Sequence, residues 1–211
     1  TTTKEIFKDK LNVYNEDSKT RPYAVMIPND GGAKKRQHGI QSAYLTYEIT
    51  VEGGITRLLA LFKDVDVEKI GPVRSSRHYF LDYAMENDAI YAHLGMSPQA
   101  DEQMKTFKIN NINGQAYDTG AARTATSLYW RATHKNAPHN AYTNIPSIKQ
   151  IAKDKGYSLK IEVDTTKKNI KDVDSKTLKE LFTRFRPVKF DYKKGKKKRY
   201  AENLCISFCI T

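Results

Sequence analysis

The sequence predicts an α/β domain in which helices flank a mixed β-sheet, and three observations support that prediction. Two apolar runs, at residues 45–51 and 55–62, flank a Glu-Gly-Gly turn, which is typical of a β-hairpin because glycine readily adopts positive φ. The middle of the chain alternates strand-like and helix-like patterns, as α/β folds do. The 211 residues, 39% of them apolar, are enough to bury one hydrophobic core.

The hairpin lies between a first strand and a first helix. Residues 21–27, RPYAVMI, predict a strand that stops at Pro28. After the Gly71-Pro72 turn, the stretch RHYFLDYAMEND has apolar residues at helical spacing. We expect that helix to begin near a Ser-Ser pair, with Ser75 or Ser76 capping its first turn.

A second strand and helix follow at once. Residues 89–94 predict a short buried strand, and Ser97 is placed as the N-cap of a helix because a proline, which suits the first helical position, comes directly after it. Residues 108–145 are rich in Asn, Gly and Thr and predict long loops. A further helix is expected near Pro146, with Asn144 as a possible cap.

The outer parts of the chain predict an arm and a second domain. Residues 1–20 are polar and aperiodic, as linkers are, and the α/β domain is expected to span 21–186. Three later stretches predict strands: residues 158–163, 187–192 and 203–211. Because the chain stops in or just after the last of them, we expect residues 187–211 to begin a smaller C-terminal β domain.

The positive charge of the chain is concentrated in one segment. Residues 184–200 hold nine of the 36 Lys and Arg side chains and one Asp, which leaves +4 of the formal charge of +12 for all other residues. A solvated loop is the more common meaning of such a run, and a polyanion site is the alternative. A nucleic-acid partner is not expected, because few aromatic residues interleave the basic ones. The 211 residues contain no apolar run long enough to span a membrane and no stretch with the pattern of a signal peptide, so we expect this segment by itself to be soluble.

The stretch EKIGPVRSSRHYF, residues 68–80, is the first candidate site. Arg74 and Arg77 stand at the expected helix start, where a cation is unfavourable by up to about 1 kcal/mol. A bound oxyanion would offset that cost, and pairing with Glu48, Glu52 or Asp82 is the structural alternative. We take the candidate ligand-binding residues to be Arg57, Arg74, Ser75, Ser76, Arg77 and Asn140.

Three further residues are candidates for acid–base catalysis. Glu52 lies at the hairpin turn, His93 ends a predicted strand, and His139 belongs to the loop HKNAPHNAYTN. His134 and His139 are five residues apart, but no third ligand has motif spacing, so no metal is expected. The chain shows no nucleophile elbow, Walker loop or dinucleotide fingerprint, and no cofactor is expected.

Several segments in the same order resemble the YerB family of bacterial lipoproteins, whose domain is named for its unknown function. They lie within roughly residues 20–150: RPYAVMI, YEITVEGGITRLLALF, KIGPVRSSRHYFLDYAMENDAIYAHLGMSPQA and APHNAYT. The resemblance implies an N-terminal lipid anchor in the full-length protein and a location on the outer face of the cytoplasmic membrane in a Gram-positive-type bacterium. It implies no reaction. The chain departs from the family pattern at Met96, where relatives often have glycine.

Three functions therefore remain open. The first is binding of an anionic cell-envelope polymer or another phosphate-bearing ligand through the arginine-rich helix start. The second is a cell-envelope hydrolase or transferase that uses Glu52, His93 and His139, and the third is a non-catalytic scaffold lipoprotein.

Overall fold

The computed structural model describes residues 18–161. The predicted arm at residues 1–20 lies outside this part except for its last three residues. The C-terminal β domain at 187–211, the basic run and the two last predicted strands also lie outside it, so the domain boundaries stay predictions. Of the strand predicted at 158–163, the described part forms a single bridge, between Thr20 and Lys160.

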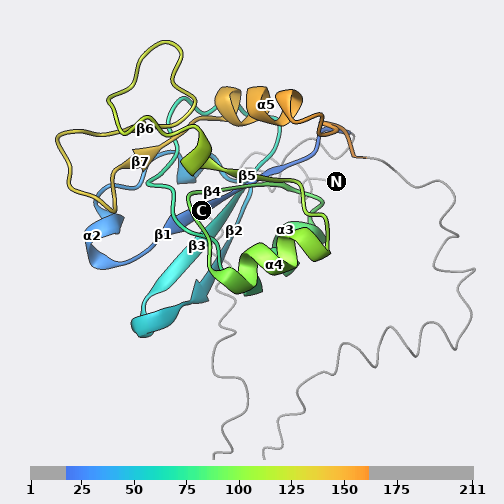
Figure 1. Cartoon of the computed structure of the whole chain (residues 1–211), viewed down its shortest axis with the longest axis horizontal. Helices are drawn as coiled ribbons and strands as arrows, with labels where there is room; N and C mark the ends of the chain where they lie inside the picture. Colours follow the sequence, from blue (N-terminus) through green and yellow to red (C-terminus); the bar gives the residue numbers. More distant parts are fainter. Residues whose placement is uncertain (1–17, 162–211) are drawn as a thin grey trace, which may run out of the picture. The chain divides into compact units, whose positions relative to one another are not determined.

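A five-stranded mixed sheet forms the centre of the described part, with the order β2-β3-β1-β4-β5 (Figure 1). Strands β1, β4 and β5 are parallel, whereas β3 runs antiparallel to both β1 and β2. Strands β6 and β7 form a separate antiparallel pair. The predicted α/β class with a mixed sheet is confirmed. The strands are β1 (Tyr23–Pro28), β2 (Leu45–Thr50), β3 (Thr56–Phe62), β4 (Ile90–His93), β5 (Asn111–Asn113), β6 (Trp130–Arg131) and β7 (Ala141–Tyr142).

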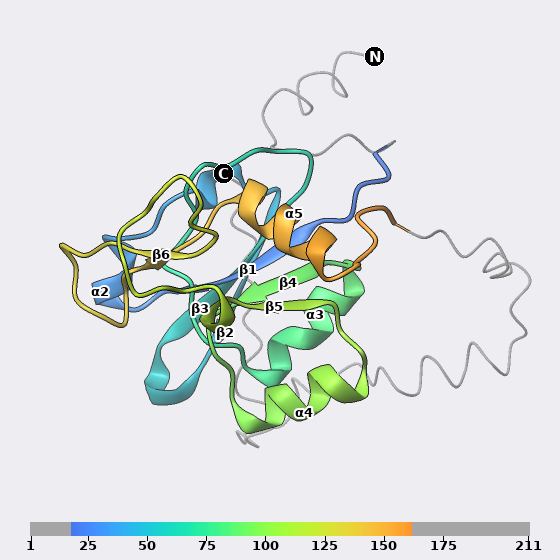
Figure 2. The ribbon, with the colours of Figure 1, turned by 45° about the horizontal axis from the view of Figure 1, so that its top comes forward.

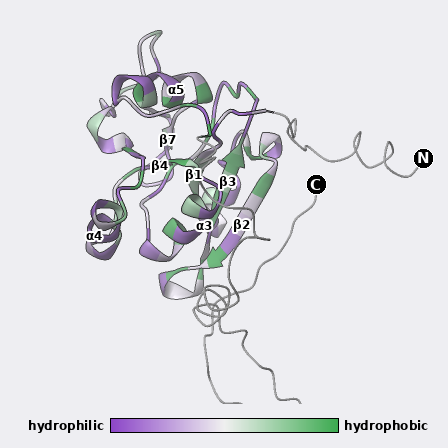
Figure 3. Ribbon diagram, turned by 90° about the vertical axis from the view of Figure 1, so that its right-hand side faces the viewer, coloured by the Kyte–Doolittle hydropathy of each residue, from purple (hydrophilic) through white to green (hydrophobic). Residues whose placement is uncertain are grey.

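Helices cover both faces of the sheet (Figure 2). Helix α5 packs on one face, and α3 and α4 pack on the other. Figure 3 shows hydrophobic residues concentrated in the strands and hydrophilic residues along α4. No helix within residues 18–161 is long and apolar enough to cross a bilayer. The helices are α2 (Gly31–Lys34), α3 (Leu81–Glu86), α4 (Pro98–Thr106) and α5 (Ile145–Asp154).

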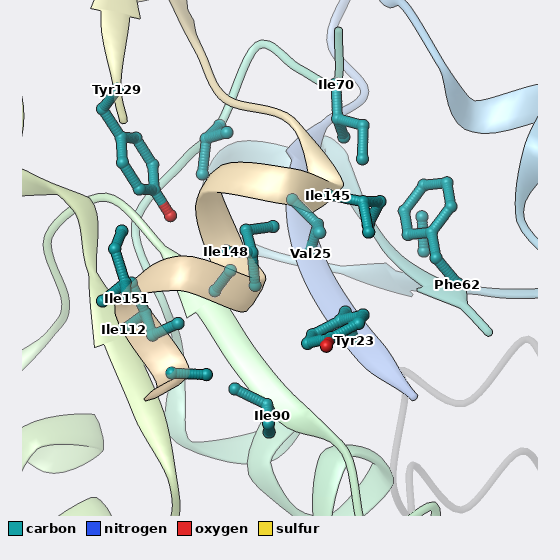
Figure 4. Close-up of a cluster of buried hydrophobic side chains, with 14 of the residues drawn as sticks. Tyr23, Val25, Phe62, Ile70, Ile90, Ile112, Tyr129, Ile145, Ile148 and Ile151 are labelled. Atoms are coloured by element: carbon teal, nitrogen blue, oxygen red, sulfur yellow. The ribbon is translucent and has the colours of Figure 1, made fainter. Parts of the chain in front are cut away.

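Alternation along β1 divides the core into two clusters. Because successive side chains of a strand point to opposite faces, Val25 packs towards α5 and Met26 packs towards α3 and α4. Figure 4 shows the first cluster, in which Ile148 and Ile151 of α5 lie against the strands. Both isoleucines are fully buried. Burial of such a side chain contributes roughly 1.5–3 kcal/mol.

The predicted hairpin and two of the three predicted helix caps, Ser97 and Asn144, are confirmed. The hairpin strands β2 and β3 pair in register from Leu45 opposite Leu61 to Thr50 opposite Thr56. The two glycines of the turn adopt φ of 75° and 71°, as the turn requires. The Ser97 side chain accepts a hydrogen bond from the amide of Ala100 in the first turn of α4. The Asn144 side chain accepts one from the amide of Ser147 in the first turn of α5.

The predicted start of the first helix is wrong. A 3-10 turn at His78–Phe80 leads into α3, the residue at the cap position makes no side-chain cap, and neither Ser75 nor Ser76 serves as one. Instead, residues 74–76, which we call the wedge segment, form hydrogen bonds to the strand ends on both sides. The Arg74 amide donates to Met26 O of β1, and the Leu94 amide after β4 donates to Arg74 O, each at 2.9 Å. The extended backbone that these bonds require excludes a helix there.

The predicted long loops at 108–145 are also corrected in part, since β5, β6 and β7 lie within them. These strands have only two or three residues, too few for an alternating pattern to be visible in the sequence.

Candidate functional site

The carboxyl ends of the parallel strands β1, β4 and β5 meet at one edge of the sheet, the usual place for a ligand site in an α/β fold. Because β3 runs the opposite way, its first residues lie at this same edge, and Arg57 pairs opposite Pro28 of β1. The wedge segment lies between the ends of β1 and β4. The ends of β1, β4 and β5, the start of β3 and the wedge segment therefore meet at this edge.

Arg57 is held inside the protein. Its side chain is only 5% exposed, and Nη1 donates to the carbonyl oxygen of Ser75. Burial lowers the pKa of Arg57, and the neighbouring charges of Arg77 and Arg74 lower it further. No carboxylate lies within 4 Å of it in the described residues. Arg57 thus adds a buried positive charge to this edge.

Arg77 has a carboxylate partner. Its Nε donates to Glu52 Oε1 at 2.8 Å, and its Nη1 donates to Ser76 O at 3.0 Å. The hydrogen bond from Arg77 is the main reason that the pKa of Glu52 is lowered. Glu52 is 64% exposed and lies at the hairpin turn, so the pair joins the hairpin to the wedge segment. For Arg77, the structural alternative considered from the sequence applies.

Arg74 has no such partner. Its side chain is partly buried, and its Nε is inaccessible to solvent and has no hydrogen-bond partner among the described residues. Burial lowers its pKa, the field of Asp30 opposes that shift, and Arg77 adds to it. No carboxylate comes within 4 Å of the guanidinium in this part of the chain. A buried cationic donor without a partner is costly, so an anionic acceptor would stabilise it.

His139 lies beside Asp30. The distance from His139 Nε2 to Asp30 Oδ1 is 3.4 Å, and the same oxygen accepts hydrogen bonds from the amides of Gly32 and Ala33 in α2. Burial lowers the pKa of His139, Asp30 opposes that effect, and Arg74 and Arg36 add to it. Its Nδ1 is buried and has no partner among residues 18–161.

Asp30 was missed by the sequence reasoning. The available signal was an acidic residue directly after the first strand and before a Gly-Gly pair, a position typical of a helix N-cap. That signal identifies a cap, but it does not show that the loop containing His139 folds back onto it.

His93 and Ser76 are engaged in the interior. His93 is fully buried, its Nδ1–H donates to Gly95 O at 2.8 Å, and its Nε2 lies 3.3 Å from Asn111 Oδ1. Burial is the main cause of its lowered pKa. The hydroxyl of Ser76 accepts a hydrogen bond from the buried Tyr91 hydroxyl at 2.9 Å. These side chains stabilise the ends of the strands.

Asn140 stabilises its own loop. Its side-chain oxygen accepts from Arg131 Nη1 at 2.9 Å, and its side-chain nitrogen donates to Lys135 O at 3.0 Å. Ser75 contributes its carbonyl oxygen, not its hydroxyl, to Arg57. The structure therefore gives Asn140 and Ser75 local contacts that do not involve Arg74.

The structure thus brings together one group, which we call the arginine cluster: three cations, two carboxylates and a histidine. Its members are Arg57, Arg74, Arg77, Asp30, Glu52 and His139. The three proposed acid–base residues have different partners, since Glu52 contacts Arg77, His139 contacts Asp30, and His93 is buried. Within residues 18–161, no group of three or more His, Cys, Asp or Glu side chains is placed to hold a metal ion.

Comparison with known proteins extends over most of the described part. Residues 10–158 match the family model described as "Protein of unknown function (DUF3048) N-terminal domain". A protein of Bacillus subtilis (strain 168) named "Putative lipoprotein YerB" is 38% identical over 154 residues, which are 73% of this chain and 44% of that protein. The crystal structure of the YerB protein from Bacillus subtilis matches with a TM-score of 0.63 and 38% identity, over 71% of this chain and 50% of the other. The chain spans about half the length of these relatives.

Proposed function

The chain belongs to the family of the DUF3048 N-terminal domain, and from that premise we propose that it is the ligand-binding part of an extracytoplasmic lipoprotein that binds an anionic group of the cell envelope. The resemblance seen in the sequence is confirmed by the family match. The relative from Bacillus subtilis is named a lipoprotein, which supports an N-terminal lipid and a location on the outer face of the cytoplasmic membrane.

The observation that supports anion binding is the state of Arg74. Its Nε–H is buried without an acceptor among the described residues, and Arg74 and Arg77 both lie close enough to Arg57 to lower its pKa. His139 Nδ1, close to the same arginine, also lacks a partner in the described part. Charge-assisted hydrogen bonds from guanidinium groups to phosphate, sulfate or carboxylate are short and strong. An oxyanion next to Arg74 would satisfy its donor and offset the repulsion among the arginines.

The two alternatives are less well supported. Hydrolysis by Glu52, His93 and His139 needs these groups to reach one substrate, but His93 is fully buried and its Nδ1–H is used by Gly95 O. A pure scaffold needs each arginine to be paired with a carboxylate. Arg77 meets that condition and Arg74 does not.

Binding to two oxyanion probes, sulfate and glycerol 1-phosphate, tests the proposal by calorimetry or NMR titration. Replacing Arg74 by Gln removes the positive charge and the forked guanidinium donors, so we expect the dissociation constant to rise about tenfold or more. Lys105→Gln is the matched control, since Lys105 is 75% exposed and pairs with Asp101 on α4. If Arg74→Gln binds both probes and purified wall polymers as well as the wild type, the proposal is wrong.

The location has its own test. The full-length protein should be removed from intact protoplasts by an added protease and should move to the soluble fraction when its lipidation cysteine is replaced. Protection from the protease would show that the domain lies on the cytoplasmic side of the membrane and would contradict the proposed location.

A further inference from the structure

The two-stranded sheet of β6 and β7 has cations stacked on its aromatic residues. Trp130 and Tyr142 are cross-strand partners. The Arg123 guanidinium lies 4.6 Å from the centre of the Trp130 ring. Lys69 Nζ and Lys135 Nζ lie 4.5 Å and 5.8 Å from the centre of the Tyr142 ring. We call these five side chains the basic face.

The positive charges of the basic face are poorly compensated. Arg123 pairs with Glu68 at 3.1 Å, and that carboxylate is 76% exposed. Lys69 and Lys135 have no carboxylate within 4 Å in the described residues. Burial lowers the pKa of Lys69, and the charges of Lys135 and Arg123 lower it further. Like charges held together in this way attract an anion, and the aromatic rings beneath them limit their movement.

A hollow of about 690 Å³ adjoins the basic face, because Arg123 belongs to the basic face and also lines the hollow together with its partner Glu68. Its walls come from the loop before β6 and from the first turn of α5, and they are rich in hydroxyl and amide groups. Asn144 and Ser147 are two of these lining residues.

Two of the lining side chains are buried and yet incompletely bonded. Asn144 and Ser147 are 5% and 7% exposed. Asn144 Oδ1 accepts from the Ser147 amide at 2.7 Å, but within residues 18–161 neither Asn144 Nδ2 nor the Ser147 hydroxyl has a hydrogen-bond partner. Both residues border the hollow. Neither atom is among the solvent-inaccessible polar atoms of the described residues that lack a partner, so both are accessible from the hollow and can bond to the hydroxyl groups of a ligand.

The basic face is connected to the arginine cluster. The Tyr142 hydroxyl, which lies 3.5 Å from Lys135 Nζ, donates to Arg36 O at 2.9 Å. Arg36 and Arg74 both act electrostatically on His139. Figure 1 shows β6 and β7 on the same side of the fold as α2, whose cap residue contacts His139. Arg36 therefore links the two groups: its backbone contacts Tyr142 of the basic face, and its charge acts on His139 of the arginine cluster.

We propose that the basic face and the adjoining hollow form a second binding subsite, which takes successive units of an extended polyanion whose units also carry hydroxyl groups. This inference rests on the proposed function, in which the arginine cluster binds one anionic group of the same polymer. Arg123, Lys69 and Lys135 would bind further negative charges of the polymer, and Asn144 and Ser147 would bond to the hydroxyl groups that lie between those charges.

A polymer that reaches both subsites binds more tightly than its monomer, since the second contact is intramolecular. We expect an oligomer of about ten glycerol phosphate units to bind the wild type at least about tenfold more tightly than glycerol 1-phosphate. Trp130, the only tryptophan of the chain, lies under Arg123, so its fluorescence reports the second contact directly.

Three variants separate the subsites. The double variant Lys69→Gln with Lys135→Gln should lose most of the gain from oligomer length, keep monomer binding and show a weaker dependence on salt. Arg74→Gln should weaken monomer and oligomer alike. Ser147→Ala should weaken the glycerol phosphate oligomer while leaving binding of inorganic polyphosphate of equal length unchanged, because polyphosphate has no hydroxyl groups between its charges. Lys105→Gln is the control, and circular dichroism checks folding.

The outcomes distinguish this inference from the proposed function. Equal affinity for monomer and oligomer, or a gain that persists in the double lysine variant, overturns the second subsite and leaves the arginine cluster intact. Oligomer binding that depends on the lysines but not on Arg74 supports the second subsite and overturns the proposed function. Unchanged oligomer binding by Ser147→Ala overturns the role of the hollow. If neither probe binds, both are wrong.

Discussion

Replacement of Glu52 by Gln tests, by the sign of its effect on sulfate and glycerol 1-phosphate binding, whether Arg77 faces the proposed anion. In the protein, Glu52 accepts the hydrogen bond of Arg77 Nε at 2.8 Å and is 64% exposed. A pair as exposed as this contributes about 0.2–1 kcal/mol. A bound oxyanion has to compete with Glu52 for Arg77. Removal of the carboxylate should therefore tighten binding by about 1.5- to 5-fold and lower the free energy of unfolding by no more than about 1 kcal/mol.

The assay is titration of sulfate and glycerol 1-phosphate into both proteins at low ionic strength, with urea unfolding beside it. Glu102→Gln on α4 is the matched control, because it removes one exposed negative charge elsewhere. Weaker binding by Glu52→Gln would refute the competition argument and show that the carboxylate itself serves the ligand. Equal affinities would mean that Arg77 does not face the anion.

Three further effects follow from the structure. Burial holds the pKa of His139 below its ordinary value, so the ring is neutral near pH 7 and gains a positive charge as the pH falls. Sulfate affinity should therefore rise as the solution is made more acidic, and His139→Gln should abolish that rise. Ser97→Ala should lower the free energy of unfolding by about 1 kcal/mol in urea and leave sulfate binding unchanged, because it removes only the α4 cap. Ile148→Ala should cost about 3 kcal/mol, while Ile55→Ala, at a side chain that is 40% exposed, should cost far less.

Each of these three predictions can be contradicted by a specific result. A pH profile of sulfate binding that is the same in wild type and His139→Gln would remove the histidine from the site. An unchanged free energy of unfolding in Ser97→Ala would show that the α4 cap contributes nothing. Similar losses for the two isoleucine variants would contradict the core described for the α5 face.

Local signals in the sequence predicted the parts of the fold that depend on local interactions. The hairpin follows from two glycines at its turn, and the helices α4 and α5 follow from Ser97 and Asn144, whose side chains bond to amides three residues away. The helix start at Ser75 and Ser76 was wrong for the opposite reason. Its backbone bonds go to Met26, Gly95 and other residues far along the chain, and no local pattern shows such partners.

The candidate site was predictable to a similar extent. Arg74 and Arg77 stood out because cations rarely gather at a helix start, yet the structure places them in extended backbone before the 3-10 turn. Their pairing differs, since Arg77 meets Glu52 from the hairpin and Arg74 meets no carboxylate. Which arginine is free depends on tertiary contacts. Asp30 was missed because its partner, His139, is more than a hundred residues away in the chain.

The wedge segment has a consequence for the speed of binding. Because its backbone is hydrogen-bonded to β1 on one side and to residues after β4 on the other, it is not free to close over an incoming anion. Within the wedge segment, capture of the proposed anion would then need side-chain rotation and no movement of the backbone, and such rotation takes picoseconds to nanoseconds. The association rate should be set by diffusion and electrostatic steering, and it should fall steeply as salt is added.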